Sequence, residues 1–255
     1  MSIRKEKEYW TSRFYKENCI EYKVSGELAL FADPITSAGG EKTTYSVPTY
    51  EALKGITKSI YWKPTFIWVI DSVRVMNPVM TESWGTRLIN INKRPGASKE
   101  ADIANYTYLV NVLYQVKAHI EWNKNRPEYI KDRNYKKHYG EFAKALLKGG
   151  RLPVFLGKSE CCAYVSVCEF GAGEGYYDHS GEISFGYMYH GITYPDEAYS
   201  EETKERLTLN LAPVIMKNGI IQFCRPSECM HQTIRTGTVK QFKEKETSYE
   251  KSSIN

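Results

Sequence analysis

The chain has 255 residues, of which 42% are hydrophobic and 25% charged, with a formal net charge of +5. This composition is that of a soluble globular protein, and the length allows one large domain or two small ones. The N-terminus lacks the apolar core of a signal peptide and no apolar run approaches the roughly 20 residues of a membrane span, so we expect a cytoplasmic protein.

The beginning of the chain predicts a strand after a polar extension. Residues 1–18 are charged with a few aromatic side chains, which fits either an added helix or a loose arm. A β-rich run from about Ile20 to Phe31 follows. Gly26 interrupts this run, so we expect a strand with a bulge at the glycine.

A helix is expected over Thr49 to Trp62, because Pro48 is tolerated in a first helical turn. Apolar residues at helical spacing predict one buried stripe, made of Leu53, Ile56 and Ile60. A different face gathers two ammonium groups and two aromatic rings, from Tyr50, Lys54, Lys58 and Tyr61. This mixture suits phosphates and bases, although a solvated lysine face edged by packed rings would have the same pattern.

Two further strands enclose an insertion. The run from Phe66 to Met76 starts with the continuous apolar residues of a central strand, and a long strand-like stretch covers Tyr106 to Trp122. Between them, residues 78–104 are polar and punctuated by Gly and Pro, which indicates an inserted hairpin. Arg87 lies on this insertion and is a candidate contact to a nucleic-acid backbone, with a mobile polar loop as the alternative.

A second helix is predicted from about Arg133 to Lys148, because Tyr135, Tyr139, Phe142 and Leu146 repeat at helical spacing. On this helix Lys137 points away from the apolar stripe and His138 lies at its flank. A strand over Pro153 to Cys168 then completes the order βαββαβ. That order is the ferredoxin-like or RRM-like pattern.

The rest of the chain predicts a small antiparallel β domain. The Gly-rich segment 171–181 acts as a joint, and Asn218-Gly219 between apolar runs is a strong hairpin signal. We therefore expect an α+β protein. Its expected parts are an N-terminal extension (1–18), a ferredoxin-like domain with an inserted hairpin (19–182, insertion about 78–104), a C-terminal β domain (183–236) and a polar tail (237–255).

The distribution of charge favours RNA more than the net charge does. Between Lys117 and Arg151 there are ten Lys or Arg residues against four acids, and the chain has 20 Tyr and 5 Trp for stacking. A solvated helix face explains these lysines equally well. The six cysteines form no CxxC pair, and the five histidines are scattered, so we expect reduced thiols and no metal or cofactor.

A series of motifs in fixed order resembles one known family. GGEK, TYSVPTY, EALKGI and SIYWKP occur in this order, followed by FIWVID, YQVKAHIEWN and RPEYIKDRNYKKHY. KGGRLPVFLGKSEC, CEFGAGEGYYD, HGITYPDE and NGIIQFCRP continue the series, which covers nearly all of Gly26 to Pro226. These motifs resemble the CRISPR-associated RAMP proteins of the fifth Cas family, most closely subtype d, which serves the type I-C Cascade complex.

The resemblance implies an endoribonuclease that cuts the CRISPR precursor transcript within each repeat and keeps the 5′ handle of the guide RNA beside other Cascade subunits. It implies a catalytic trio from the IYW and KHY motifs: Tyr61, Lys137 and His138. Lys136 leaves the lysine assignment open by one residue. Such a trio needs no metal, because the 2′-OH of RNA can attack the adjacent phosphorus with help from a base, a cation and an acid.

The other cations expected to contact RNA are Lys54, Lys58, Lys136, Arg133, Lys144 and Arg87. Two alternatives stay open. The chain can be a non-catalytic RNA-binding subunit, as most members of the fifth Cas family are, or a general nucleic-acid binder that also holds duplex DNA. A Tyr at a helix end, a His beside an apolar stripe and a Lys pair are each also ordinary structural features.

Overall fold

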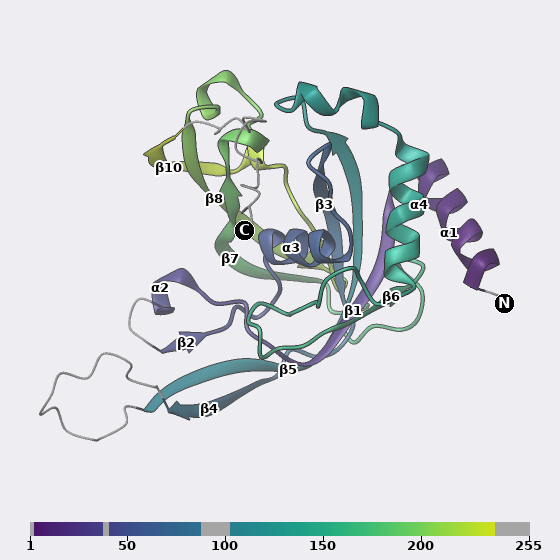
Figure 1. Cartoon of the computed structure of the whole chain (residues 1–255). Coiled ribbons are helices and arrows are strands. Elements are labelled where there is room, and N and C mark those ends of the chain that lie inside the picture. The colour runs from purple at the N-terminus through teal and green to yellow at the C-terminus, as the bar shows by residue number, and fades with distance from the viewer. Residues whose placement is uncertain (1–2, 38–40, 88–102, 238–255) are drawn as a thin grey trace, which may run out of the picture.

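The computed structural model describes residues 3–37, 41–87 and 103–237. Part of the predicted insertion (88–102) and nearly all of the predicted tail (238–255) lie outside the described residues. Within the described part, the chain has a mixed α/β fold built on one large, mostly antiparallel sheet (Figure 1).

The sheet has ten strands in the described residues, and its hydrogen-bonded path runs β10-β8-β9-β3-β5-β1-β6. Off this path, β2 and β4 pair with β5, and β7 pairs with β8. The strands are β1 (Ile20–Ala29), β2 (Lys42–Thr43), β3 (Phe66–Val75), β4 (Thr81–Arg87), β5 (Ile103–Trp122), β6 (Tyr164–Val167), β7 (Glu182–Thr193), β8 (Arg206–Lys217), β9 (Ile220–Gln222) and β10 (Met230–Thr236).

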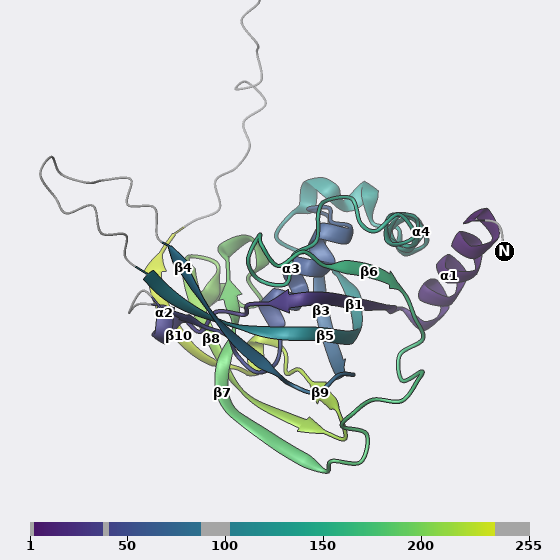
Figure 2. The same cartoon turned by 90° about the horizontal axis from the view of Figure 1, so that it is seen from below.

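Helices cover one face of the central strands. Figures 1 and 2 show α3 and α4 on the same side of β3, β5 and β1, with α1 lying outside α4. The α-helices are α1 (Ile3–Glu17), α2 (Pro34–Ser37), α3 (Tyr50–Ile60) and α4 (Tyr135–Leu146). Short 3-10 helices are η1 (Pro127–Asp132), η2 (Pro195–Glu197), η3 (Glu201–Thr203) and η4 (Pro226–Glu228).

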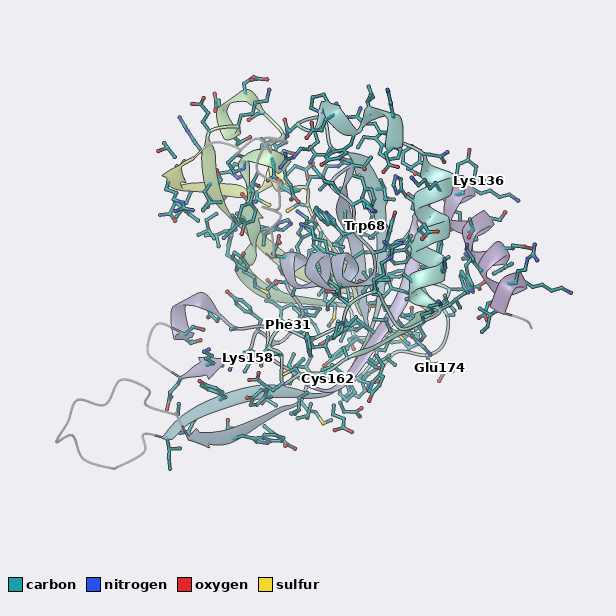
Figure 3. The ribbon with its side chains drawn as sticks, viewed as in Figure 1. Phe31, Trp68, Lys136, Lys158, Cys162 and Glu174 are labelled. Carbon is teal, nitrogen blue, oxygen red and sulfur yellow. The ribbon has the colours of Figure 1, made fainter. Side chains whose placement is uncertain are left out.

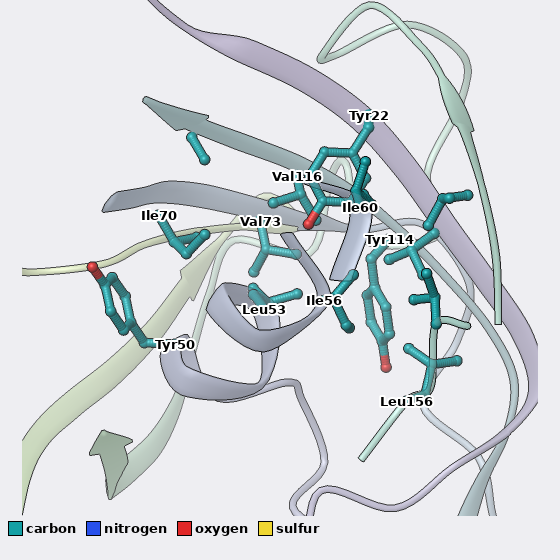
Figure 4. Packing of buried hydrophobic residues seen from close by; sticks show 14 of the residues in the cluster. Tyr22, Tyr50, Leu53, Ile56, Ile60, Ile70, Val73, Tyr114, Val116 and Leu156 are labelled. Atoms are coloured by element: carbon teal, nitrogen blue, oxygen red, sulfur yellow. The ribbon is translucent and has the colours of Figure 1, made fainter. Parts of the chain in front are cut away.

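The core lies between α3, α4 and the sheet. The predicted stripe Leu53, Ile56 and Ile60 is buried and shares one cluster with residues of β3 and β5 (Figure 4). Burying each such side chain contributes about 1.5–3 kcal/mol. The largest buried side chain is Trp68 on β3, which lies near the centre of the molecule in Figure 3.

The extension before β1 is a helix rather than a loose arm. In α1, Trp10 and Phe14 are buried, and the Phe14 ring lies 6.1 Å from that of Phe142 on α4. Gly140 permits this approach, because a Cβ there would lie 3.3 Å from the Thr11 side chain.

Two local predictions need correction. The bulge at Gly26 is wrong, because β1 keeps one constant register against β5 on both sides of the glycine. The strand expected over Pro153 to Cys168 shortens to β6, since the preceding residues form a loop with left-handed Gly157 (φ 94°). In the region of the predicted insertion, β4 pairs with β5 and ends at Arg87, and residues 88–102 lie outside the described part.

The strands of the predicted C-terminal β domain continue the main sheet through β9, which pairs with β3. Asn218 and Gly219 have the positive φ of the predicted turn, with values of 46° and 79°, and they join β8 to β9. β10 was not expected. The division of the chain into domains stays a prediction.

Candidate active site

Tyr61 is held at the junction between α3 and β3. The Thr49 side chain caps the start of α3 by accepting from the backbone N–H of Ala52, and the helix ends at Ile60. Tyr61 then turns to an extended conformation (φ −160°, ψ 130°), which breaks the helix. Its carbonyl accepts a hydrogen bond of 2.7 Å from Nε1 of the buried Trp68. The backbone around the phenol is therefore fixed on both sides.

His138 sits in the first turns of α4. Asn134 caps this helix by accepting from the backbone N–H of Lys137, and η1 ends just before it at Asp132. The imidazole Nε2 lies 2.8 Å from the backbone oxygen of Asp132, and Nδ1 lies 2.8 Å from the Tyr61 hydroxyl. Because a carbonyl can only accept, Nε2 carries the proton and the Tyr61 hydroxyl donates to Nδ1.

The Asp132 carboxylate accepts hydrogen bonds from polar groups at the edge of the Tyr61–His138 pair. Lys137 Nζ donates to Asp132 Oδ1, and Thr65 Oγ1 donates to Oδ2 over 2.9 Å. The same carboxylate oxygen lies 3.5 Å from His138 Nε2. The bond from Lys137 is the main reason that the pKa of Asp132 is lowered. Asp132 thus links the exposed lysine to the imidazole.

Burial sets the protonation states of the pair. His138 is 0% exposed and Tyr61 only 1%. Desolvation lowers the pKa of His138 and raises that of Tyr61 to about 12, against the opposing charge of Arg151. At neutral pH the pair is therefore a neutral imidazole that accepts a proton from a protonated phenol.

The walls of the site are aromatic, and its rim is cationic. The rings of Phe66 and Trp122 lie 5.0 and 5.9 Å from the His138 ring. The Arg151 guanidinium stacks 4.3 Å above the Tyr61 ring and also binds Glu141. Lys137 and Arg151 are themselves exposed. Anions can therefore approach the rim, while the Tyr61–His138 hydrogen bond lies beneath it.

The structure brings together the three residues of the predicted trio but exposes only one. The resemblance left open whether Lys136 or Lys137 belongs to the trio, and the geometry favours Lys137 because it donates to Asp132. Lys136 instead lines the groove between α1 and α4 (Figure 3). Lys137 also borders that groove.

The expected exposed basic face of α3 requires correction. Lys54 is buried, with its ammonium paired to Glu197 of η2, and Lys58 pairs with the same carboxylate over 2.9 Å. The loop that carries η2 covers this face, which helical periodicity alone could not reveal. A contact of either lysine with RNA stays a prediction. In this structure both ammonium groups form ion pairs with the Glu197 carboxylate.

The remaining predicted cations are spread over the molecule. Lys144 on α4 is exposed. Arg133 is partly buried and donates to the Asn123 carbonyl over 2.9 Å. Arg87 is the last residue of β4, and its side chain lies outside the described part.

Sequence reasoning missed Asp132 and Arg151. Both lie within the quoted motifs, Asp132 in RPEYIKDRNYKKHY and Arg151 in KGGRLP, but neither motif indicates which side chains meet. Asp132 reaches His138 because η1 folds back onto the start of α4, and Arg151 reaches Tyr61 because its backbone N–H bonds to the carbonyl of Ile60.

Among residues 3–37, 41–87 and 103–237, two groups of side chains have the spacing of metal ligands. They are His190 with Cys224 and Cys229, and Glu17 with Cys19 and Glu21. Neither group includes a residue of the trio. Within the same ranges, no helix is long and apolar enough to cross a membrane.

Comparison with known proteins identifies relatives over most of the chain. A family described as CRISPR-associated protein (Cas_Cas5), in its Cas5d form, matches residues 19–224. A CRISPR pre-crRNA endoribonuclease Cas5d from Mannheimia succiniciproducens is 31% identical over an alignment of 150 residues, with a coverage of 52% of this chain. The match spans 64% of the length of that relative.

Two solved structures are similar in both sequence and fold. A CRISPR-associated protein is 32% identical with a TM-score of 0.69, and the match covers 84% of this chain and 96% of the other. A functionally uncharacterized protein from Streptococcus mutans is 36% identical with a TM-score of 0.68, and the match covers 84% and 97%. The family match starts at residue 19, so α1 lies outside it.

Proposed function

The chain belongs to the Cas5d family of CRISPR-associated proteins, and on that premise we propose that it is an endoribonuclease acting on CRISPR precursor RNA. It cuts within each repeat, downstream of the hairpin, and retains the 5′ handle of the guide RNA as a subunit of a type I-C Cascade complex. The name of the Mannheimia succiniciproducens relative supports the activity. The observation that carries the proposal is the hydrogen bond of 2.8 Å between Tyr61 and His138.

The proposed reaction is an attack by the RNA itself. The 2′-oxygen forms a bond to the adjacent phosphorus, the bond to the 5′-oxygen breaks, and the products are a 2′,3′-cyclic phosphate and a 5′-OH. Tyr61 takes the 2′-OH proton while passing its own to His138 Nδ1, and the resulting imidazolium faces the Asp132 carboxylate. The pair later returns a proton to the leaving 5′-oxygen.

Lys137 stabilises the charge on the phosphorane oxygens. In the free protein Asp132 holds this lysine, and Glu141 holds Arg151 over the Tyr61 ring. A phosphate competes with both carboxylates for these cations. Because the acid–base pair is buried, the proposal requires that RNA binding draws Lys137 and Arg151 aside and exposes the Tyr61 hydroxyl. Asp132 is then a positioning residue.

The mechanism is tested with an end-labelled repeat hairpin in EDTA. We expect the purified chain to cut at one position and to leave a 2′,3′-cyclic phosphate. A single 2′-deoxy nucleotide on the 5′ side of the scissile phosphate should abolish cutting, because it removes the nucleophile. Cutting that needs Mg²⁺, or that survives the 2′-deoxy substitution, would contradict the proposed chemistry.

A second function is favoured by the burial of the pair. Tyr61 and His138 are 1% and 0% exposed, as expected of side chains that only support the fold. The chain would then be a non-catalytic RNA-binding subunit, and the trio would orient η1 and α4. Tight binding of the repeat with no cleavage would favour this function. Competition by duplex DNA in the same binding assay would show whether the basic segment also holds DNA.

We further assign the core to the ferredoxin-like class. The order β1, α3, β3, β5, α4, β6 reads βαββαβ, and its strands neighbour one another as β3-β5-β1-β6, which supports that class. The β4–β5 pair is the proposed inserted hairpin, and β7 to β10 are the proposed C-terminal β domain.

A further inference from the structure

Three side chains meet where β7 lies beside the segment that joins β9 to β10. His190 lies on β7, Cys224 follows β9 and Cys229 precedes β10. A ring nitrogen of His190 and the two sulfur atoms all lie within 4.8 Å of one another. The two sulfurs are 3.5 Å apart. In this group His190 and Cys229 are buried and Cys224 is partly buried.

The hydrogen bonds of His190 leave one nitrogen without a partner. Nε2 lies 3.0 Å from the carbonyl oxygen of Cys224, so Nε2 carries the proton and donates it. Nδ1 then has a free lone pair. His190 is only 3% exposed, and its Nδ1 is buried with no hydrogen-bond partner. Buried polar atoms without a partner are rare in folded proteins and need a physical explanation.

The imidazole is also fixed in place. Its ring stacks on Tyr50 of α3 at a centroid distance of 4.1 Å and an interplanar angle of 18°. A metal-binding His typically donates its other N–H to a carbonyl or carboxylate, which fixes the tautomer and the ring. His190 has this arrangement with Cys224.

We propose that His190, Cys224 and Cys229 bind a Zn²⁺ ion. Two thiolates and an imidazole are zinc ligands, and a Zn–S distance of about 2.3 Å in tetrahedral geometry puts two sulfurs about 3.8 Å apart. The observed separation of 3.5 Å is close to this value. Water or a ligand atom from a bound molecule completes the fourth position. The bound ion links β7 to the segment that joins β9 to β10.

Sequence spacing hid this site. The two cysteines are five positions apart, outside the CxxC pattern, and the histidine precedes Cys224 by 34 positions. Only the pairing of β7 with β8, and of β8 with β9 and β10, brings the three residues together. The zinc site is independent of the proposed ribonuclease activity, because it shares no residue with the trio.

The test uses the full chain purified under reducing conditions, stripped with EDTA and titrated with Co²⁺. We expect a sulfur-to-cobalt charge-transfer band that saturates at one ion per chain and disappears when Zn²⁺ is added. The double variant Cys224→Ser/Cys229→Ser should lack the band. Cys162→Ser removes an exposed thiol outside the cluster and should keep it. A wild type without the band, or a double variant that keeps it, would overturn the site.

A second measurement avoids variants altogether. With Zn²⁺ present, alkylation of Cys224 and Cys229 in the wild-type chain should slow, while alkylation of Cys162 should not change. The competing outcome is a disulfide, because the two sulfurs are close enough to be oxidised together. Zinc binding would be ruled out by a Cys224–Cys229 disulfide that survives the reducing conditions. It would also be ruled out if these two cysteines were alkylated at the same rate with and without Zn²⁺.

Discussion

At the scale of single residues, the two hydrogen bonds of His138 decide what the imidazole can do. One nitrogen donates to the Asp132 carbonyl and the other accepts from Tyr61, so the ring can take up one further proton only at Nδ1. The resemblance named Tyr61, Lys137 and His138 from motifs, and the helix faces allowed them to meet. Neither indicated that Asp132 would join Lys137 to His138, because that contact depends on how η1 folds.

Replacing Tyr61 with Phe tests the role of the phenol. The ring stays in its pocket, but the donor to His138 Nδ1 is lost. We expect the cleavage rate to fall by roughly 10² or more, since positioned acid–base groups contribute 10²–10⁴. We expect stability to fall by only about 1 kcal/mol, the net value of one hydrogen bond. Single-turnover cleavage and urea unfolding measure the two effects. An unchanged rate with reduced stability would make Tyr61 a purely structural residue.

The pKa of His138 predicts a pH dependence of stability. The folded state lowers this pKa, through burial and the nearby Lys137 and Lys63, against the opposing effect of Asp132. The unfolded chain therefore binds the proton more readily, and the stability that His138 contributes is present above about pH 6.5 and lost as pH falls below it. His138→Asn cannot titrate in this way. The difference in free energy of unfolding between wild type and His138→Asn should become smaller as the pH falls from 7.5 to 5. Urea unfolding at each pH measures this difference. A gap that is constant with pH would contradict the assignment.

At the scale of elements, apolar periodicity located the central strands and both covering helices to within a few residues. It failed where contacts between distant segments decide the conformation. The basic face of α3 is covered because Glu197 arrives from a loop about 140 residues later in the chain. The residues before β6 form a loop because Gly157 is left-handed, and this turn is held against the main sheet where the Leu156 carbonyl accepts from the backbone N–H of Leu30, directly after β1.

Substitution of Gly157 tests whether the loop before β6 packs against the end of β1. Its φ is +94°, and an added Cβ would lie 1.9 Å from the carbonyl oxygen of Leu30. Gly157→Ala should therefore destabilise the fold by more than about 4 kcal/mol or prevent folding, because both the backbone and the packing oppose it. Gly149 is a matched control, with φ +83° and open space around it. Gly149→Ala should cost only about 1–2 kcal/mol. Equal urea midpoints for the two variants would show that the loop does not pack on β1 as described.

At the scale of the whole molecule, one sheet joins the central strands β3, β5, β1 and β6 to the strands β7 to β10. The pairing of β9 with β3 makes this connection. The hairpin signal at Asn218-Gly219 predicted β9 itself, but it did not indicate which strand would pair with the other edge of β9. The trio lies at the end of α3 and the start of α4, whereas the His190–Cys224–Cys229 cluster lies on β7 and beside the segment that joins β9 to β10. The family match ends at residue 224 and starts at residue 19, so α1 and β10 are features of the chain beyond it.

We propose that the Tyr61–His138 pair cuts RNA without a metal. The most direct measurement is the single-turnover cleavage rate of the repeat RNA in EDTA for wild type, His138→Asn and His231→Ala. Asn keeps an acceptor near Nδ1 but cannot take up or release a proton near neutral pH, and His231 is an exposed control on β10. We predict that wild type and His231→Ala cut at one position, while His138→Asn binds the RNA equally and cuts at least about 10²-fold more slowly. Equal rates for all three would place the chemistry elsewhere, and binding without cutting by wild type would contradict the enzyme.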